Sequence, residues 1–566
     1  MKKKKTQRQG NPWILFVLFF TVVGVTLVAR HCYPEPRIVQ QSQNQYWRRV
    51  NLHSTRGIIQ DTKGNALVIS DTIPSFAVDP SLLTSDDFGK ISSLISEDLI
   101  VKIRQAIGTK SRFLWLEHKV ADENLIQKYK NLLKDSRAFI EIDEPYRKYT
   151  NNSLMAHILG FCDVDNKGQA GIEQGWDDVL YDPPGQKIVV RKPRNSSRSA
   201  ALPPSLLERD PDDRVTPVIT LTLDSRIQYV VEKHLFQAAQ NDGAKWAVCV
   251  CMDPNTGEIF AMASYPSYDP QNRKTLTIES LSNSVVSRGY EPGSTFKPIY
   301  LAVALERGWA RYDENFFCPA KLKVADGFIR ESNSNVAFGD ISTAELLIKS
   351  SNVGMAQIGI RADKTKTYES LLALGFGTES DIELPGVAKG ILPYPENWRG
   401  ITPANIAIGQ GLAVTPLQLI TAMSAIVNGG KLVSPYIVKE AVNSHGEVVY
   451  RGRPKIMREV YNPETTAWIR KAMRRVVLEG TGRRANTELT ELAGKTGTAQ
   501  VPEGGKYSKN RYVASFIGFW PYEDPKYLML VVIGEPSTGR IYGGELAAPT
   551  FKSIVEEMAE LEYYSL

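Results

Sequence analysis

The chain has 566 residues, of which 42% are hydrophobic and 23% are charged. This length exceeds what one hydrophobic core usually serves, so two or more domains are expected. The formal net charge is only +6, with 68 basic against 62 acidic residues, and much of the excess stands at the basic start "MKKKKTQR". The near balance elsewhere argues against a nucleic-acid-binding protein.

An apolar segment follows the basic start. Residues 13–29 contain no charged side chain, and they lie within a run that approaches the length needed to span a bilayer. The positive-inside rule predicts a cytoplasmic tail at residues 1–10 and a single uncleaved anchor at residues 11–30. The remaining body then lies in the periplasm or outside the cell. A cleaved signal peptide is the alternative, but the run is long and "LVARHC" lacks a small-x-small cleavage site.

Cysteine and histidine usage indicates no metal site. The five cysteines are scattered at Cys32, Cys162, Cys249, Cys251 and Cys318. Cys249 and Cys251 would face the same side of one strand, where they are poorly placed to bond each other. The six histidines form no ligand cluster either. We therefore expect no metal.

The first half reads as a stalk followed by a mixed domain. Residues 36–49 are polar and are expected to continue as a helical stalk. Residues 54–80 read as short strands around turns, and residues 81–135 alternate apolar and charged positions at helical spacing. Prolines, serines and clustered charges in residues 183–213 predict a linker or surface loop. A domain boundary near residue 212 would separate a domain at 31–211 from one at 212–566.

The second half has a strand–helix–strand layout. Residues 218–224 predict a strand, residues 225–241 a helix, and residues 245–266 two strands around the turn "DPNTG". Helices and loops are expected from 290 to about 480. Three strands return near the end, before a last helix at 547–564. Two strands early and three late predict one antiparallel sheet with helices on both sides, an α/β or α+β fold.

The stretch "EPGSTFKPIY" contains Ser294 and Lys297, the one place where a lysine follows a serine by three residues. The turn Glu291-Pro292-Gly293 predicts a helix start near Ser294, which puts both side chains on one face. A serine hydroxyl becomes a good nucleophile when a base takes its proton, and a lysine can do so when burial or a second cation lowers its pKa. Alone, the pattern also fits a serine cap beside a solvated lysine.

Two further motifs follow in the chain. Ser350 and Asn352 form an S-x-N pair, which supplies a hydroxyl for proton relay and an amide for substrate binding, although a simple turn or cap fits too. The second motif starts a predicted strand and consists of Lys495, Thr496, Gly497 and Thr498. A lysine there presents a fixed cation to an anionic substrate, threonine hydroxyls can bind a carboxylate, and glycine permits close approach. An ordinary strand with an exposed lysine is the alternative.

In this order the three motifs resemble those of penicillin-binding proteins and serine β-lactamases. Over nearly its whole length the chain resembles the class B penicillin-binding proteins, with a transpeptidase domain after a pedestal (dimerisation-type) domain. "RGIIQDTKGNAL" is similar to the first pedestal box, and the second box is matched by Arg147, Tyr149, Ala156, His157, Gly160, Gly171 and Glu173. Thr62 and Thr150 depart from the usual arginine and proline. Among subgroups, "IGQGLAVTPLQL" and "YGGELAAPTFK" look most like the division-specific, FtsI-type group.

The resemblance implies D,D-transpeptidation of peptidoglycan stem peptides in septal cell-wall synthesis, without a cofactor and with β-lactams as inhibitors. Ser294 would attack the D-Ala-D-Ala carbonyl, Lys297 would act as base and Ser350 as relay. Asn352 would bind the substrate's amide backbone, while Lys495 and Thr498 would hold its carboxylate. The resemblance also implies a single-pass protein of the cytoplasmic membrane with a SEDS-type glycosyltransferase and other division proteins as partners, and no nucleic acid.

Three alternatives remain at this stage. The elongation-specific class B transpeptidase is the nearest one. A D,D-carboxypeptidase or β-lactamase would use water as the acceptor, but such enzymes are usually smaller and lack the pedestal. A non-catalytic β-lactam sensor or division scaffold should lack an intact set of motifs or carry a larger cytoplasmic part, whereas only about ten residues precede the anchor.

Overall fold

The computed structural model describes residues 12–32, 47–51, 55–109, 111–120, 122–163, 165–182, 186–190, 215–272, 274, 276–325, 327–332 and 336–563. The chain divides into two compact units. One comprises residues 1–54 with 183–214, and the other comprises residues 55–182 with 215–566. The expected boundary near residue 212 lies outside the described residues.

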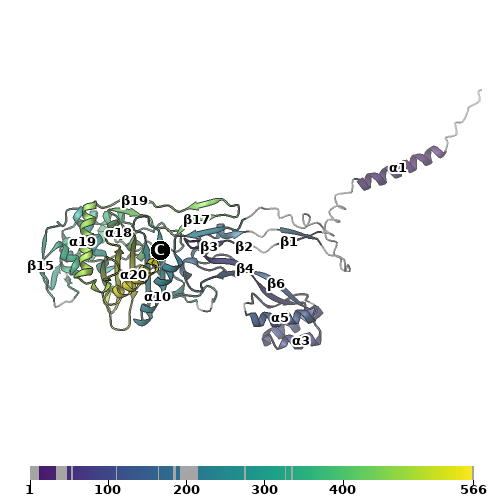
Figure 1. Cartoon of the computed structure of the whole chain (residues 1–566), viewed down its shortest axis with the longest axis horizontal. Helices are drawn as coiled ribbons and strands as arrows, with labels where there is room; N and C mark the ends of the chain where they lie inside the picture. The colour runs from purple at the N-terminus through teal and green to yellow at the C-terminus, as the bar shows by residue number, and fades with distance from the viewer. Residues whose placement is uncertain are drawn as a thin grey trace, which may run out of the picture. The chain divides into compact units, whose positions relative to one another are not determined.

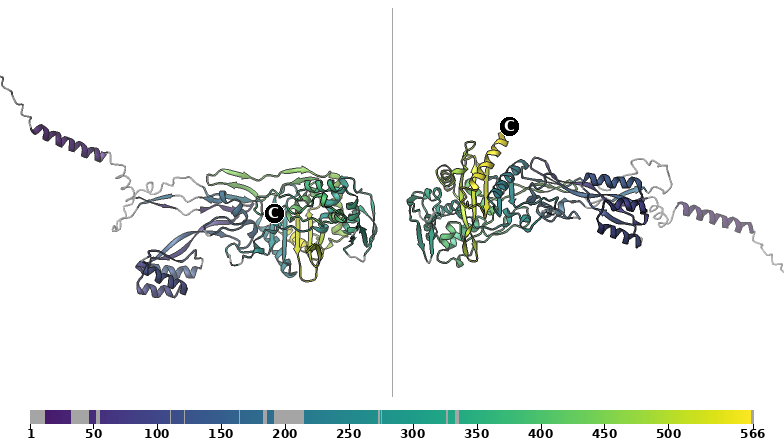
Figure 2. Two further views of the ribbon diagram at one scale, coloured as in Figure 1. Left: turned by 180° about the vertical axis from the view of Figure 1, so that it is seen from behind. Right: turned by 90° about the horizontal axis from the view of Figure 1, so that it is seen from below.

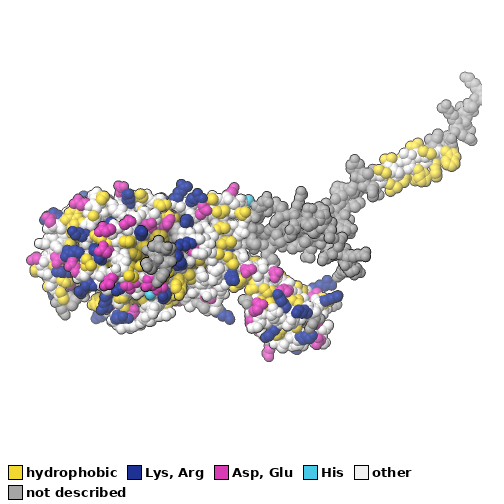
Figure 3. Space-filling model, in the orientation of Figure 1, with side chains coloured by type: hydrophobic (Ala, Val, Ile, Leu, Met, Phe, Trp, Pro, Cys, Tyr) yellow, Lys and Arg dark blue, Asp and Glu magenta, His cyan; other side chains and the backbone are white. Residues whose placement is uncertain are grey.

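The apolar segment near the N-terminus is helical. Helix α1 (Pro12–Cys32) spans 21 residues, and apolar side chains cover much of its surface (Figure 3). Within the described parts of the chain, however, no helix is both long and apolar enough to cross a membrane. The anchor expected at residues 11–30 therefore stays a prediction from the sequence.

Two segments of the first unit form strands where the sequence suggested none. Strand β1 (Trp47–Asn51) pairs antiparallel with β8 (Gln186–Val190). The helical stalk expected at residues 36–49 is thus wrong for residues 47–49, and its earlier part lies outside the described residues. The expected linker is likewise wrong for residues 186–190. The partner of each strand lies far away in the sequence, so local pattern carries no sign of the pairing.

A seven-stranded sheet joins the two halves of the second unit. Its order is β18-β17-β9-β3-β4-β5, with β6 also paired to β4. Its strands are β3 (Ile58–Gln60), β4 (Ala66–Val78), β5 (Leu114–Glu117), β6 (Phe139–Tyr149), β9 (Val218–Leu221), β17 (Val438–Val442) and β18 (Val448–Arg451). Strand β9, which the sequence predicted, runs parallel to β3. It therefore belongs to this sheet and not to the sheet of the second half.

Three helices cover one end of this sheet, as the helical spacing of residues 81–135 predicted, but that prediction is wrong for residues 114–117, which form strand β5. The helices are α3 (Ser85–Ser92), α4 (Glu97–Gly108) and α5 (Glu123–Asp135), and they lie together in both views of Figure 2. Their apolar faces share a core with β4, where Phe76 stacks on Tyr129 with ring centroids 4.5 Å apart. Asp122 caps α5 by accepting the backbone N–H of Asn124.

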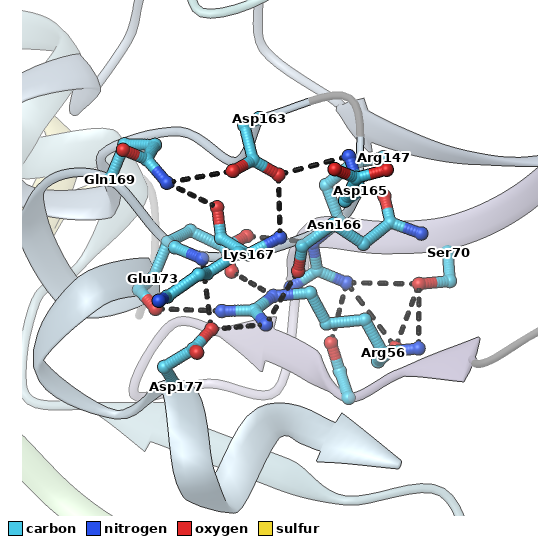
Figure 4. A network of polar contacts seen from close by, with 12 residues as sticks. Arg56, Ser70, Arg147, Asp163, Asp165, Asn166, Lys167, Gln169, Glu173 and Asp177 are labelled. Carbon is cyan, nitrogen blue, oxygen red and sulfur yellow. Dashed lines mark hydrogen bonds and ion pairs between the residues drawn. The ribbon is translucent and has the colours of Figure 1, made fainter. Parts of the chain in front are cut away.

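A buried ionic network joins residues from three distant parts of the first half of the sequence (Figure 4). Arg56 and Arg147 each donate to one carboxylate oxygen of the fully buried Glu173, Arg147 at 2.6 Å. Arg56 also donates to Asp177 at 2.7 Å, and Arg147 to the carbonyl of Gly57 at 2.6 Å. Burial alone would raise the pKa of Glu173, but Arg147 and Arg56 outweigh it and hold that pKa below its ordinary value. Three of the residues that matched the pedestal boxes, Arg56, Arg147 and Glu173, are thus in direct contact.

The predicted antiparallel sheet of the second half is confirmed. Its order is β11-β10-β22-β21-β20, and every pairing is antiparallel. The strands are β10 (Trp246–Met252), β11 (Ile259–Tyr265), β20 (Ala493–Glu503), β21 (Lys506–Trp520) and β22 (Tyr527–Gly534). The early pair occupies one edge and the late strands complete the sheet, as the layout of the sequence implied.

Helices cover both faces of this sheet because β10 is apolar on both sides. Val248 and Val250 face a core shared with α13 (Lys297–Glu306) and α18 (Pro416–Val427). Cys249 and Cys251 face the opposite core, shared with α10 (Ser225–Asn241) and α20 (Ala547–Tyr563). The α10 and α20 helices lie on the same side of the sheet in Figure 1. The two thiols form no disulfide with each other, as the strand geometry predicted, and both are buried.

The segment between β11 and β20 is less helical than expected. Its longer helices are α13, α15 (Asn352–Arg361), α16 (Lys364–Ala373), α18 and α19 (Pro463–Leu478). Small two-stranded sheets stand between them, formed by β12 (Asn315–Cys318) with β15 (Gly339–Ser342), β13 (Lys321–Val324) with β14 (Gly327–Arg330), and β16 (Lys431–Val433) with β19 (Ile456–Glu459). These strands are three or four residues long, too short for an alternating pattern to stand out.

Candidate active site

Ser294 lies on a turn that leads directly into a helix. The 3-10 turn η3 (Gly293–Phe296) continues as α13, so the helix start expected near Ser294 is confirmed. Gly293 has φ +55°, a left-handed conformation that favours glycine. Ser294 is 9% exposed, and its hydroxyl has no hydrogen bond among the described residues. The hydroxyl can therefore meet an incoming substrate without first breaking a contact.

Two glycines let the Ser294 turn pack closely against strand β20. A Cβ added at Gly293 would lie 3.1 Å from the carbonyl oxygen of Thr498. A Cβ at Gly497 would collide with the Ser515 hydroxyl and lie 2.9 Å from Cγ2 of Thr295. Larger residues at these positions would push the turn and the strand apart. The close approach explains the glycine within the KTG motif.

Lys297 is fully buried and points toward the S-x-N motif. Its Nζ donates to the carbonyl oxygen of Ser350 at 2.7 Å and to Oδ1 of Asn352 at 2.7 Å, with the Ser350 hydroxyl at 3.4 Å. Burial lowers the pKa of Lys297 to about 7, although Glu331 and Cys318 act in the opposite direction. At neutral pH a substantial fraction of this amine is therefore unprotonated.

Ser350 and Asn352 lie where α14 (Thr343–Ile348) gives way to α15. Ser350 has φ +57°, which is unusual for a residue other than glycine and typical of functional sites. Asn352 donates through Nδ2 to the carbonyl of Arg330 at 2.9 Å. Since its amide nitrogen is committed there, its Oδ1 is turned toward Lys297.

Lys495 approaches Ser350 from strand β20. Its Nζ donates to the Ser350 hydroxyl at 2.8 Å and to the carbonyl of Thr496 at 3.0 Å. Burial and the positive charge of Lys297 both lower the pKa of Lys495. Two buried amines thus flank one hydroxyl, and protonating both at once would set like charges against each other in a low-dielectric site.

The threonines of the KTG motif are held by neighbours that the sequence did not single out. The Thr496 hydroxyl lies 2.6 Å from the hydroxyl of Thr481. The Thr498 hydroxyl accepts the backbone N–H of Gly543 at 3.1 Å. Both interactions orient hydroxyls on the strand that carries Lys495, so the expected carboxylate-binding groups have fixed directions.

The structure brings the predicted site residues together by two kinds of contact. Hydrogen bonds join Lys297, Ser350, Asn352 and Lys495. Ser294 adjoins this group through the chain and through the packing of its turn on β20. A direct hydrogen bond between Ser294 and Lys297 is absent among the described residues, which is common before substrate binds.

One buried acid at the site was missed. Glu331 follows β14 and accepts hydrogen bonds from Ser351 and from the backbone of Asn352. It stands in "FIRESNSN", which matches no chemical motif, so a single sequence held no signal for it.

A cavity of about 480 Å³ adjoins the Ser294 turn. Its walls include Glu291, three residues before the serine, and residues 499–502, which continue β20 beyond the KTG motif. Glu291 accepts the backbone N–H of Gly411 at 2.9 Å through one oxygen, while its other oxygen is buried without a partner among the described residues. The cavity therefore borders β20 just beyond the KTG motif.

The chain matches two protein-family models. The penicillin binding protein transpeptidase domain matches residues 247–556. The penicillin-binding protein dimerisation domain matches residues 51–201. The first match contains every residue of the site described above.

Individual relatives are similar over most of the chain. Stage V sporulation protein D of Bacillus subtilis is 31% identical over 96% of this chain and 85% of its own length. The peptidoglycan D,D-transpeptidase FtsI of Escherichia coli is 29% identical over 92% of this chain and 85% of its own. Among solved structures, penicillin binding protein 3 of Mycobacterium tuberculosis complexed with ampicillin has a TM-score of 0.68 and 26% identity, covering 91% of this chain and 96% of that chain. The similarity spans both halves of the chain.

Proposed function

The chain belongs to the class B penicillin-binding proteins, and on that premise we propose that it is a serine-type D,D-transpeptidase that cross-links peptidoglycan stem peptides. The observation that carries the proposal is the buried hydrogen-bonded group of Lys297, Ser350 and Lys495 beside Ser294. Together with Ser294 it supplies a nucleophile, a base and a relay in one site. The family membership supplies the substrate class.

In the first half-reaction Ser294 attacks the carbonyl of the penultimate D-Ala. Its hydroxyl proton passes to neutral Lys297, and the carbonyl oxygen becomes an oxyanion held by the backbone N–H groups of Ser294 and Thr498. The bond to the terminal D-Ala then breaks. The leaving amine takes a proton delivered through Ser350, which bridges Lys297 and Lys495. An acyl ester on Ser294 remains.

In the second half-reaction an amine from another stem peptide attacks this ester. The amine loses a proton to the same base, a peptide bond forms, and the ester bond to Ser294 breaks. Ser294 recovers its proton and the enzyme is restored. A β-lactam would form the same ester, but its ring-opened portion stays attached and leaves Ser294 blocked.

Substrate binding helps to set the protonation states of Lys297 and Lys495. The terminal carboxylate lies against Lys495 and the hydroxyls of Thr496 and Thr498, while Asn352 binds the peptide backbone. A carboxylate beside Lys495 raises the pKa of that amine, because it replaces like-charge repulsion by attraction. When only one of the two amines is protonated, the proton then resides on Lys495, and Lys297 is neutral. Substrate would thereby prepare its own base.

Acylation should slow at low pH. The pKa of Lys297 is about 7, and below this value the protonated amine cannot accept the Ser294 proton. The second-order rate constant for acylation by benzylpenicillin should thus fall about tenfold per pH unit below the pKa and level off above it. Stopped-flow measurement on the full-length protein in detergent provides the profile. A rate that stays constant through the acid range would contradict a Lys297 base.

The reaction itself can be tested with the full-length protein in detergent. A stem peptide ending in D-Ala-D-Ala is supplied with an amine acceptor, and products are followed by mass spectrometry. We expect release of D-Ala and a penicillin-sensitive peptide bond to the acceptor. Hydrolysis without transfer would identify a carboxypeptidase. Acylation by penicillin without turnover of any peptide would favour the sensor.

We assign the enzyme to septal synthesis at the cytoplasmic membrane. Support comes from the apolar composition of residues 11–30 and the similarity to FtsI. In this assignment residues 1–10 are cytoplasmic, a pedestal at residues 31–211 meets a SEDS-type glycosyltransferase and other division proteins, and the catalytic domain at 212–566 is outside. Depletion of the protein should give long filaments. In a separate experiment, a tagged copy of the protein should localise to division sites. Rounded cells after depletion would instead indicate the elongation role.

A further inference from the structure

Glu331 is a buried residue that contacts the S-x-N motif. It is 3% exposed and follows β14. Its Oε1 accepts the Ser351 hydroxyl at 2.6 Å and the backbone N–H of Val353 at 3.3 Å, and its Oε2 accepts the backbone N–H of Asn352 at 2.7 Å. One carboxylate thus binds the first turn of α15, whose backbone N–H groups have no partner within the helix.

The adjacent residue reinforces this attachment. The carbonyl of Arg330 accepts the Asn352 side-chain amide at 2.9 Å, and Ser351 itself accepts the backbone N–H of Gly354 at 3.0 Å. Asn352 is therefore bound at its backbone by Glu331 and at its side chain by Arg330. Its Oδ1 is left to receive Lys297 at 2.7 Å.

We propose that Glu331 is a positioning residue of the active site: it holds residues 351–353 beside Lys297 and places a buried carboxylate near that lysine. The proposal rests on the transpeptidase function proposed above. Glu331 does not touch the reacting atoms. It acts through Ser351 and Asn352 on geometry, and through its charge on the protonation of the base.

Several charged and titratable groups surround Glu331 and Lys297. The titratable groups in this region are Lys297 on α13, Cys318 at the end of β12, Lys495 on β20 and, beside Cys318, Asp340 on β15 and Lys349 after α14. Burial lowers the pKa of Lys297, and the negative charge of Glu331 is the first influence that opposes it. Without that charge, the pKa of Lys297 should fall further.

A purely structural role for Glu331 predicts something different. If the carboxylate only capped α15, its loss would loosen the S-x-N segment and slow acylation equally at every pH. If its charge also reaches Lys297, its loss moves the acid limb of the pH–rate profile. The position of that limb therefore separates the two roles, whatever happens to the plateau rate.

The test compares pH profiles of acylation by benzylpenicillin for the full-length wild type and Glu331→Gln. The plateau rate should fall several-fold, and the acid limb should move to lower pH by at least about 0.5 unit. A limb that stays in place while the rate falls would overturn the electrostatic part of the proposal. Failure of the wild type to acylate at all would instead overturn the proposed function.

Two further variants complete the design. Glu345→Gln removes a carboxylate that accepts the backbone N–H of Ser342 at 2.9 Å, in the cap of α14. The acid limb of its pH–rate profile should coincide with that of the wild type. A shift as large as that of Glu331→Gln would mean that any lost helix cap in this region suffices. Glu331→Asp retains the charge but shortens the reach. Its plateau rate should fall several-fold, and an unchanged rate would overturn the positioning role even if Glu331→Gln fails to fold.

Discussion

Replacing Ser294 with alanine should abolish covalent labelling by a fluorescent penicillin and slow stem-peptide cross-linking by about 10⁴-fold or more. The loss follows because the Ser294 oxygen forms the acyl ester, and neither Lys297 nor Ser350 is placed to replace it at the turn. The folded state should be almost unaffected, since the hydroxyl makes no hydrogen bond among the described residues. Labelling is measured by gel fluorescence on the full-length protein.

Ser553→Ala provides a matched control for this experiment. Ser553 lies on α20, where its hydroxyl donates to the carbonyl of Pro549 at 3.2 Å, outside the cleft. Its labelling should equal that of the wild type. Persistent labelling of Ser294→Ala under the same conditions would mean that another residue carries the acyl group.

Glu173→Gln should reduce the free energy of unfolding by about 3 kcal/mol or more. The substitution removes the charge that compensates two buried guanidinium groups, Arg56 and Arg147. Thermal unfolding of the full-length protein should show a midpoint several degrees lower, and urea unfolding a midpoint at a lower urea concentration. Penicillin acylation well below that midpoint should persist, because none of these residues lines the cleft.

The contribution of Glu173 to the free energy of unfolding should also depend on pH. The pKa of Glu173 is depressed in the folded protein, so its contribution is present above the ordinary carboxyl pKa of about 4.3 and is lost as the pH falls below it.

Asp86→Asn is the control for Glu173→Gln. It removes an exposed ion pair with Lys90 and should change stability by no more than about 0.5 kcal/mol. Equal stability of the two variants would contradict a compensated buried network.

The five-stranded antiparallel sheet could be predicted because its strands are marked locally. In β10 successive residues such as Val248 and Cys249 face opposite sides and are both apolar, which predicts burial on both faces and hence helices on both sides. The turn at residues 253–257 then fixes the pairing of β10 with β11. The reactive residues were identifiable for a similar reason, since each motif stands on a short segment that its own neighbours shape.

What could not be predicted depends on partners distant in the chain. Strands β1 and β8 pair across more than a hundred residues, and neither carries the alternation that marks a half-buried strand. Strand β9 was predicted, and β3 lies within residues 54–80, which were predicted to form short strands, but no local pattern indicated that these two strands pair in parallel. Glu331 illustrates the same limit at the site: its role depends on Asn352, 21 positions away.

The pedestal network shows both sides of this limit. Arg56, Arg147 and Glu173 were matched through a family resemblance, yet that resemblance did not say that they touch. Arg56 and Glu173 are 117 positions apart. A lone arginine or glutamate is most often a solvated surface residue, so only the fold identifies these three as a buried group.

The position of the acyl bond would show whether Ser294 is the nucleophile. The full-length protein is incubated with benzylpenicillin, its intact mass is measured, and the adduct is located by peptide sequencing in a mass spectrometer. We expect one adduct per chain, with the mass of the whole antibiotic, on Ser294. An adduct on any other residue, or an unchanged mass for folded protein, would contradict this role of Ser294.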